Sequence, residues 1–213
     1  MRALYDSKSK TINDRGIKEL LTKEEKYRTW LEVEVALAQA QAEYGIIPLE
    51  AAEEIVEKGK LENLDFEKMD RIYQKIGHGF VPFLKVLVEA CGEESGKYIH
   101  YGITTQNVQQ TSQVLIMKKI HNKFMVIISE ILENLSRLAE KEAATVMAGR
   151  THGKHAIPIT YGYKVSVWIS ELIVGVERMK ELEKRTFTLM MGGAVGAFNV
   201  TGNIGIEVQT RVA

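Results

Sequence analysis

The fold is decided by residues 103–148, ITTQNVQQTSQVLIMKKIHNKFMVIISEILENLSRLAEKEAATVMA, a stretch that contains neither glycine nor proline. Apolar side chains such as Ile128, Ile131 and Leu135 recur in it at spacings of three and four residues, which places them on one face of a helix. This pattern predicts one very long helix. About 40 helical residues extend roughly 60 Å, which is more than a compact domain of this size needs for itself. We therefore expect the helix to pack against partners along its whole length.

Shorter stretches with helical periodicity flank the long one. A capping box of Thr22 and Glu25 opens a predicted helix at about residues 23–44, and Gly45 follows it. Further helices are predicted at about residues 49–58, 66–76, 80–91, 160–185 and 205–213.

Prolines and strand signals complete the prediction of the fold. Each of the three prolines, Pro158 among them, is read as the start of a helix, because the first turn of a helix tolerates proline. Strand signals are weak, and only the short stretch at residues 186–191 is read as a candidate for extended structure. The sequence therefore predicts an all-α fold, in which a small N-terminal helical domain, residues 1–102, is followed by part of a long-helix bundle, residues 103–213.

The composition excludes several classes of protein. With 28 basic and 28 acidic residues, the chain lacks the net positive field on which non-specific nucleic-acid binding depends. The single cysteine, Cys91, cannot form an internal disulfide. No apolar run approaches the ~20 residues that span a bilayer, and residues 1–10 carry charges where a signal peptide would be apolar. We expect a cytoplasmic protein without nucleic-acid or membrane partners.

Four of the five histidines lie in breaks next to glycine, where a rigid scaffold can aim a side chain at a ligand. They are His78, His100, His152 and His155, whereas His121 lies on the long helix and is read as a surface or interhelix residue. For each of the four taken alone, a structural role near a helix cap is an equally good interpretation. Together they indicate acid–base chemistry by histidine.

Other chemistries fit the sequence less well. His152 and His155 are three residues apart but have no third metal ligand at motif spacing, and Cys91 has no Cys-x-x-Cys partner. No Gly-x-Ser-x-Gly motif is present for a nucleophilic serine. Residues 192–196, Gly-Gly-Ala-Val-Gly, match neither the dinucleotide fingerprint nor the P-loop and have no lysine after them, so they do not indicate a phosphate cradle; a loop that binds something polar is the alternative.

A run of polar residues opens the long helix. Thr104, Thr105, Gln106 and Asn107 follow Gly102, at a point where free backbone N–H groups and the positive end of the helix dipole favour an anion. A carboxylate would fit there. Simple N-capping by Thr104 or Thr105 is the alternative interpretation.

Three blocks of the sequence carry a resemblance to a known family. Residues 97–107 (KYIHYGITTQN), 147–160 (MAGRTHGKHAIPIT) and 192–196 (GGAVG) resemble, in order and in spacing, three successive blocks of the adenylosuccinate lyase branch of the fumarase/aspartase superfamily. Residues 27–34 and 44–48 resemble that branch as well. The resemblance therefore covers nearly the whole chain.

The resemblance implies a reaction and an assembly. The reaction is an anti β-elimination that releases fumarate from adenylosuccinate or a related succinylated nucleotide in purine biosynthesis. A base takes the proton next to a carboxylate, and an acid protonates the leaving nitrogen. The assembly is a homotetramer, in which long helices of four subunits form a central bundle and three subunits build each active site. No metal or organic cofactor is implied.

The resemblance also implies roles for particular residues. His152 would be the general acid, with Thr151 beside it as a second catalytic residue. The substrate-binding residues would be His78 on the nucleotide side, together with His100, Tyr101, Thr104, Thr105 and Gln106. Hydroxyls and helix N–H groups in this set would stabilise the negative charge of the carbanion-like intermediate.

Three departures from the family pattern leave the substrate open. Residues 78–79 read His-Gly where the family has His-Asp, residues 153–155 read Gly-Lys-His where it has Gly-Gln-His, and its Arg-Tyr pair is not evident in residues 1–6. A lyase acting on another succinylated amine or dicarboxylic acid is the alternative within the enzyme class. A cycloisomerase acting on 3-carboxymuconate shares the fold, but these enzymes typically carry tryptophan at the place of His152.

The end of the chain bears on activity. The family carries its catalytic base, a serine, on a mobile Ser-Ser-x-Met-Pro-x-Lys loop well after the block at residues 192–196, and this chain ends at Ala213. We therefore expect an N-terminal portion of a lyase, which is inactive alone and shows no fumarate release from adenylosuccinate. A non-catalytic fragment that folds and self-associates without turnover is the alternative from a different class.

Overall fold

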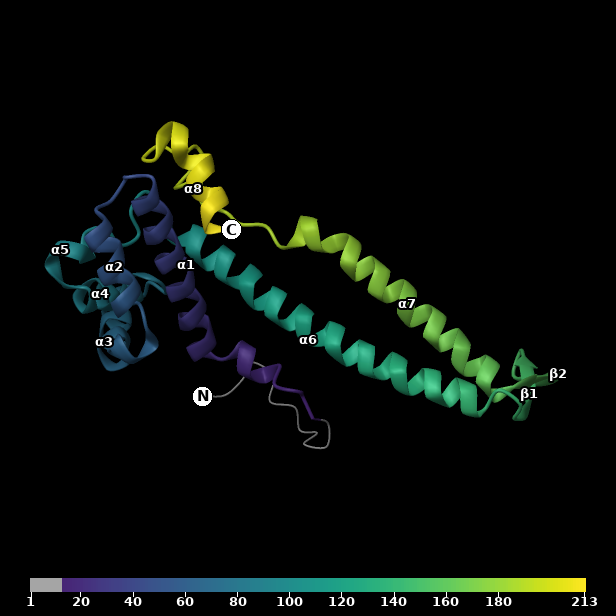
Figure 1. Cartoon of the computed structure of the whole chain (residues 1–213). Helices are drawn as coiled ribbons and strands as arrows, with labels where there is room; N and C mark the ends of the chain where they lie inside the picture. Colours follow the sequence, from purple (N-terminus) through teal and green to yellow (C-terminus); the bar gives the residue numbers. More distant parts are fainter. Residues whose placement is uncertain (1–12) are drawn as a thin grey trace. The chain divides into compact units, whose positions relative to one another are not determined.

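The computed structural model describes residues 13–213 (Figure 1). The helices in this part of the chain are α1 (Lys23–Glu43), α2 (Leu49–Lys58), α3 (Phe66–Ile76), α4 (Val81–Ala90), α5 (Gly92–Gly96), α6 (Thr105–Lys141), α7 (Tyr161–Thr186) and α8 (Gly205–Val212), with short 3-10 helices at η1 (Lys18–Leu21), η2 (Leu61–Asn63) and η3 (Gly202–Ile204). Two strands, β1 (Val146–Thr151) and β2 (Lys154–Thr160), form an antiparallel hairpin. Since helices dominate, the all-α prediction is confirmed.

Local sequence signals explain where several helices begin and end. The Thr22 hydroxyl oxygen accepts a hydrogen bond of 3.2 Å from the N–H of Glu25 at the start of α1, as the capping box predicts. Asp65 opens α3 in the same way, by accepting from the N–H of Lys68 at 2.9 Å. Gly77 ends α3 with a left-handed φ of 64°, which glycine adopts without steric cost. The predicted bounds of these helices agree with the structure to within one or two residues.

The chain divides into two compact units. Of the described residues, 13–118 and 187–213 form the first unit, and Lys119–Thr186 form the second. The boundary falls inside α6, so this helix contributes to both units. The predicted domains, residues 1–102 and 103–213, stay a prediction.

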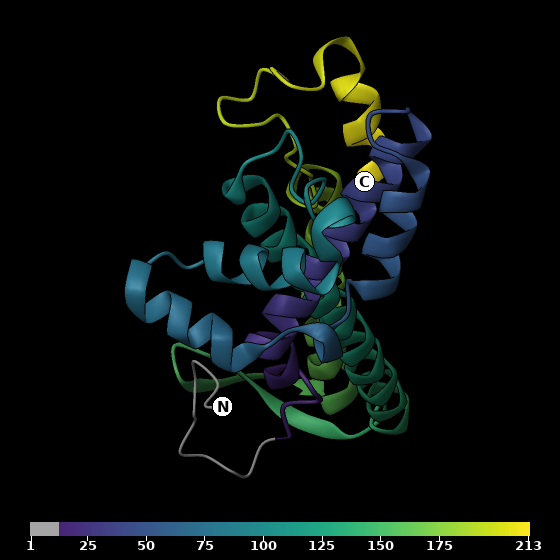
Figure 2. The ribbon, with the colours of Figure 1, turned by 90° about the vertical axis from the view of Figure 1, so that its left-hand side faces the viewer.

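The core of the first unit is built around α1. The Trp30 ring of α1 lies 4.5 Å from the Phe80 ring and 5.2 Å from the Phe83 ring, and all three side chains are buried. On another face, α2 and α8 pack against α1 (Figure 2). A buried hydrogen bond of 2.8 Å between the hydroxyls of Thr29 and Ser112 joins α1 to α6. These contacts hold together the helices that carry the candidate site of this unit.

The predicted long helix is α6, which has 37 residues. It ends at Lys141, and the last residues of the glycine-free stretch, 146–148, belong to β1 and not to the helix. The turn after α6 is bonded to the start of α7, because the N–H of Gly162 donates to the Glu142 carbonyl at 2.9 Å. A Cβ on Gly162 would lie 2.5 Å from the Ala139 carbonyl oxygen, so only glycine allows this close approach. The hairpin bridges the two helix ends.

Pro158 does not start a helix, which corrects the prediction. It lies in β2 opposite Ala148, and the helix begins three residues later, at Tyr161. Thr160 caps that helix by accepting from the N–H of Tyr163 at 3.2 Å. Both strands of a hairpin are edge strands. Proline is tolerated there because its position without an N–H can face solvent and not a neighbouring strand. The structure assigns no strand to residues 187–191.

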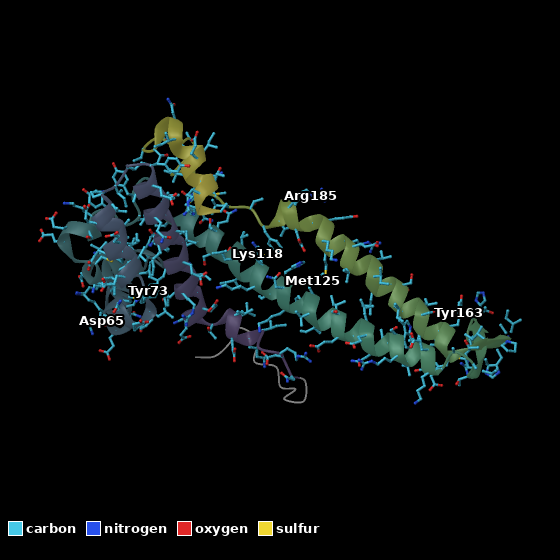
Figure 3. The ribbon with its side chains drawn as sticks, viewed as in Figure 1. Asp65, Tyr73, Lys118, Met125, Tyr163 and Arg185 are labelled. Atoms are coloured by element: carbon cyan, nitrogen blue, oxygen red, sulfur yellow. The ribbon has the colours of Figure 1, made fainter. Side chains whose placement is uncertain are left out.

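In the second unit both long helices carry exposed apolar residues. Figure 3 draws the side chains of these helices as sticks. Each of the following is at least 40% exposed: Phe124, Val126 and Ile131 of α6, and Val167, Trp168, Ile173, Val174 and Leu182 of α7. The expectation that these helices pack against partners stays a prediction. Within residues 13–213, every helix is too short or too polar to cross a bilayer.

Candidate active site

His100 lies in the break between α5 and α6 and is held by a carboxylate. Its backbone φ is 60°, a left-handed value that is uncommon outside glycine. In this conformation the backbone N–H donates to Oε2 of Glu34 at 3.1 Å, while ring nitrogen Nδ1 lies 2.7 Å from Oε1 of the same side chain. The Glu34 side chain is 1% exposed and that of His100 is 14% exposed. One buried glutamate therefore binds both the backbone and the ring of His100.

The bond pattern determines which nitrogen of His100 can face a ligand. An ionised carboxylate has no hydrogen to donate, so Nδ1 must carry the proton shared with Glu34. The Phe80 ring packs against the imidazole, with 5.4 Å between ring centres. Because Nδ1 is engaged and the ring is packed, Nε2 is the atom left to act on a substrate.

The start of α6 is organised by Asn107. Its side-chain oxygen accepts hydrogen bonds of 3.1 Å from the N–H of Thr104 and of 3.1 Å from the N–H of Gly193. Neither the Thr104 nor the Thr105 hydroxyl has a hydrogen-bond partner within residues 13–213. Capping by a threonine hydroxyl, the alternative interpretation, is therefore not what the structure shows. Both hydroxyls remain open to a ligand.

The glycine-rich loop is bound to the same helix face. The Thr111 hydroxyl, one turn after Asn107, lies 3.4 Å from both the N–H and the carbonyl of Met190. The N–H of Met191 donates to the side-chain oxygen of Gln209 at 3.3 Å. With the Gly193 bond to Asn107, three N–H groups of residues 190–193 are therefore already bonded to protein. The expectation that this loop binds something polar stays a prediction.

His78 has a structural task in the first unit. Its Nδ1 accepts hydrogen bonds of 3.1 Å from the N–H groups of both Phe80 and Val81, so the imidazole caps α4. An accepting Nδ1 is unprotonated, so the hydrogen of the neutral ring is on Nε2. The side chain is exposed, which leaves Nε2 open to solvent or to a ligand. The bond pattern of His78 is thus opposite to that of His100.

Thr151 and His152 belong to the second unit, at the tip of the hairpin. Thr151 pairs with Lys154, so His152 and Gly153 form a two-residue turn. Their φ values are 49° and 73°, and two positive φ values are what a type I′ turn requires. His152 is exposed and has no hydrogen-bond partner within residues 13–213. Its ring is therefore not committed to packing or capping.

The remaining predicted residues contribute through the backbone or are exposed. The Tyr101 carbonyl accepts a hydrogen bond of 2.7 Å from the buried Gln41 side chain, while the Tyr101 phenol is exposed. Gln106 is exposed, and its amide lies 3.5 Å from Gln110. The Arg-Tyr pair sought in residues 1–6 falls outside the described residues. The roles given to all of these residues stay predictions.

The sequence analysis did not identify Glu34 and Asn107, the two residues that hold the candidate site residues of the first unit in place. Glu34 could have been found as a charge on the apolar face of α1, three or four residues from Trp30 and Leu37, which are buried. Asn107 was grouped with the polar run, although its buried side chain sets the helix start. The hairpin was also missed, and its signal was the His152-Gly153 pair between two β-branched stretches.

Two other chemistries receive no support from the geometry. Cys91 is buried, and this burial raises the pKa of its thiol to about 11, so it is a poor nucleophile near neutral pH. Within residues 13–213, His, Cys, Asp and Glu side chains do not gather in a group of three or more that could hold a metal ion.

Comparison with known proteins places the chain among lyases. A family model described as Lyase matches residues 5–213. The adenylosuccinate lyase of Methanocaldococcus jannaschii is 40% identical over 190 residues, which cover 89% of this chain and 41% of that protein. The N-acetyl-S-(2-succino)cysteine lyase of Enterococcus italicus is 38% identical over 181 residues, which cover 85% and 40%. The chain thus spans about two fifths of the length of these relatives.

Solved structures agree with this placement. A fumarate lyase from Mesorhizobium sp. BNC1 matches with a TM-score of 0.88 and 34% identity, covering 94% of this chain and 47% of that one. The β-carboxy-cis,cis-muconate cycloisomerase from Acinetobacter calcoaceticus sp. ADP1 matches with a TM-score of 0.87 and 29% identity, covering 94% and 48%. The resemblance read from the three sequence blocks is confirmed at the level of the superfamily.

Proposed function

Because the chain belongs to the lyase family, within the fumarase/aspartase superfamily, we propose that it carries the substrate-binding groups and the general acid of a lyase that releases fumarate from adenylosuccinate or a related succinylated compound. The observation that supports this most directly is the break at His100. There a buried Glu34 fixes the imidazole, and the α6 start that follows presents the free hydroxyls of Thr104 and Thr105. These groups suit a carboxylate.

Binding would use the two negative charges of a succinyl group. One carboxylate accepts hydrogen bonds from the hydroxyls of Thr104 and Thr105, where the N-terminus of α6 adds the positive end of its dipole. His100 contributes Nε2, which donates when the ring is doubly protonated against Glu34. As the carbon next to the carboxylate loses its proton, charge grows on these oxygens and the same contacts strengthen.

His152 would supply the proton for the leaving group. In the elimination, the C–H electron pair becomes the new C=C bond of fumarate, the bond between carbon and the leaving nitrogen breaks, and the nitrogen takes a proton from the acid. An exposed imidazole on a tight turn, free of internal hydrogen bonds, is available for that transfer. Thr151 precedes it on β1 and would assist. The acceptor of the carbon-bound proton is assigned to no residue of this chain.

Two relatives keep the leaving group open. The match to an N-acetyl-S-(2-succino)cysteine lyase at 38% identity favours a second candidate, in which a thiol leaves from a succinyl thioether. The match to a cycloisomerase structure supports a third, a reaction on a 3-carboxymuconate-type dicarboxylate. His152 favours the lyases, since protonation of a leaving heteroatom needs an acid at this position.

We also propose the setting in which the activity operates. The exposed apolar side chains of α6 and α7 fit a homotetramer in which these helices meet those of other copies. The enzyme acts in the cytoplasm, in purine biosynthesis if adenylosuccinate is its substrate. The chain by itself releases no fumarate, because a complete site needs the catalytic base.

A chimera tests the proposed function. Residues 5–213 replace the matching segment of the Methanocaldococcus jannaschii adenylosuccinate lyase, which supplies the rest of the enzyme. Adenylosuccinate, N-acetyl-S-(2-succino)cysteine and 3-carboxymuconate are offered in turn, and fumarate or lactone formation is followed by absorbance. We expect turnover of one succinyl substrate, and a loss of about 10²–10⁴-fold when His152→Ala is introduced.

Two controls keep the outcome clear. The unmodified archaeal lyase verifies the assay, and circular dichroism with light scattering verifies that each chimera is folded and assembled. A folded tetramer that turns over none of the three compounds contradicts the proposal. An unchanged rate in the His152→Ala chimera removes this residue from the role of general acid.

A further inference from the structure

The contact between Glu34 and His100 is more specific than packing requires. A buried glutamate is costly unless its oxygens are paired, and here both oxygens are bound by one residue. Oε2 takes the backbone N–H, which holds the left-handed φ of 60°, and Oε1 takes the ring at 2.7 Å. The backbone and the side chain of His100 are therefore oriented by a single carboxylate.

Three elements meet at this imidazole. Glu34 comes from α1, the Phe80 ring from the start of α4 faces the imidazole at 5.4 Å, and the break itself leads into α6. With Phe80 on one side and Glu34 on Nδ1, ring rotation would break a short hydrogen bond and an aromatic contact. The His100 side chain keeps 14% of its surface exposed, so a ligand can reach part of it.

We propose that Glu34 is a positioning residue, which holds His100 with Nδ1 protonated and presents Nε2 to the substrate carboxylate. This inference rests on the proposed function only for the identity of the ligand. When Nε2 also takes up a proton, the ring becomes a cation whose charge Glu34 balances, so His100 can donate to an anion at Nε2 without breaking its bond to Glu34. A neutral residue at position 34 could not provide this balance.

The variant that separates positioning from packing is Glu34→Gln. Glutamine has nearly the same shape, so its oxygen keeps the bond from the backbone N–H of His100. Its NH₂ group then faces Nδ1, which can only accept, and the ring hydrogen moves to Nε2. The substitution therefore inverts the protonation of His100 with little change in volume. The matched control is Glu24→Gln, the same chemical change at an exposed position of α1.

The first measurement is the protonation of the ring in the 213-residue chain. Long-range ¹H–¹⁵N spectra distinguish the two nitrogens, only five histidines contribute, and the His100 signal is assigned by its loss in His100→Gln. We expect protonated Nδ1 in the natural chain and in Glu24→Gln, and protonated Nε2 in Glu34→Gln. An Nε2-protonated neutral ring in the natural chain overturns the proposal, whether or not Glu34→Gln folds.

The second measurement tests the ligand, with fumarate as the probe. Fumarate is titrated into the natural chain, Glu34→Gln and Glu24→Gln, and the His100 ring signals are followed. We expect binding to weaken by at least about tenfold in Glu34→Gln alone, because a charge-assisted bond at Nε2 is lost. Equal affinities in all three chains refute the positioning role. If fumarate leaves His100 unchanged in the natural chain, the proposed function fails at this site, while the ring protonation still decides the role of Glu34.

Discussion

Replacing Asn107 tests whether the α6 start depends on one amide oxygen. Asn107 is 1% exposed, and its side-chain oxygen accepts two hydrogen bonds of 3.1 Å, one from the N–H of Thr104 and one from the N–H of Gly193. Asn107→Ala leaves both donors without that partner. A neutral hydrogen bond contributes about 1 kcal/mol, and a buried donor left unpaired costs about 1–3 kcal/mol. We expect the free energy of unfolding of the first unit to fall by about 2–4 kcal/mol.

The matched variant is Asn107→Asp. It keeps an oxygen in the same place, and its negative charge lies in the first turn of α6, where the helix dipole is favourable by about 0.3–1 kcal/mol. Burial of the new charge opposes this gain, so the free energy of unfolding should fall by clearly less than in Asn107→Ala. The contrast between alanine and aspartate isolates the acceptor from the volume of the side chain.

Tryptophan fluorescence during urea unfolding measures this effect in one unit. Trp30 is 3% exposed in the first unit, whereas Trp168 of the second unit is removed by Trp168→Phe in every sample. With a urea slope of about 2 kcal/mol per M, the expected loss lowers the midpoint by about 1–2 M. A fall of less than about 0.5 M for Asn107→Ala, or an equal fall for Asn107→Asp, would refute the reasoning.

Three further contacts give predictions with defined readouts. Burial raises the pKa of the Cys91 thiol to about 11, so Ellman's reagent at pH 8 should label the folded chain far more slowly than the urea-unfolded chain, and equal labelling rates would contradict this. The free energy of unfolding should fall as pH rises from about 9 to 11, because the unfolded thiol loses its proton first. Removing the α4 cap with His78→Ala should cost about 1–2 kcal/mol in urea unfolding, and His78→Asn should recover part of it; no loss in His78→Ala would show that the cap is dispensable. A double-mutant cycle of Thr29→Val and Ser112→Ala, read by the same unfolding curves, should give a coupling of about 0.5–1.5 kcal/mol across their 2.8 Å bond, whereas additive effects would deny it.

Helix positions were predictable because their signals are local. Thr22 and Asp65 cap helices within three residues of themselves, and Gly77 ends one by its own backbone conformation. Such signals need no knowledge of the rest of the chain. The helices predicted at residues 49–58 and 66–76 therefore have the same bounds as α2 and α3.

The hairpin was missed because its strands are short and its signals are shared with helices. Residues 142–148 contain no glycine or proline, so no local signal ends the helix before Gly149. Residues 146–151 form a strand because they pair with residues 154–160, and a short sequence window does not contain this contact. Pro158 fits either a helix start or an edge strand, and only the partner strand separates these readings.

The sequence directs attention to His100, Thr104 and Thr105, because they stand in a glycine-flanked break before a long helix; their roles toward a ligand stay predictions. It does not indicate the residues that hold them in place. Glu34 lies 66 residues away from His100 in the chain, and its role depends on the packing of α1 against the break. A buried charge on an apolar helix face is a signal of an unseen partner, but the sequence does not name that partner.

The hydrogen bond between Gly193 and Asn107 also has a consequence for folding during synthesis of the chain. Its ends are 86 residues apart, so the acceptor leaves the ribosome long before its donor is made. At ~5–20 residues per second, synthesis of that stretch takes roughly 4–17 s. Throughout this interval α1 and the beginning of α6 can fold around Glu34, while the Asn107 oxygen still lacks one of its two donors. Gly193 then supplies the missing donor, so the start of α6 gains its second bond to Asn107 only late in the synthesis of this unit.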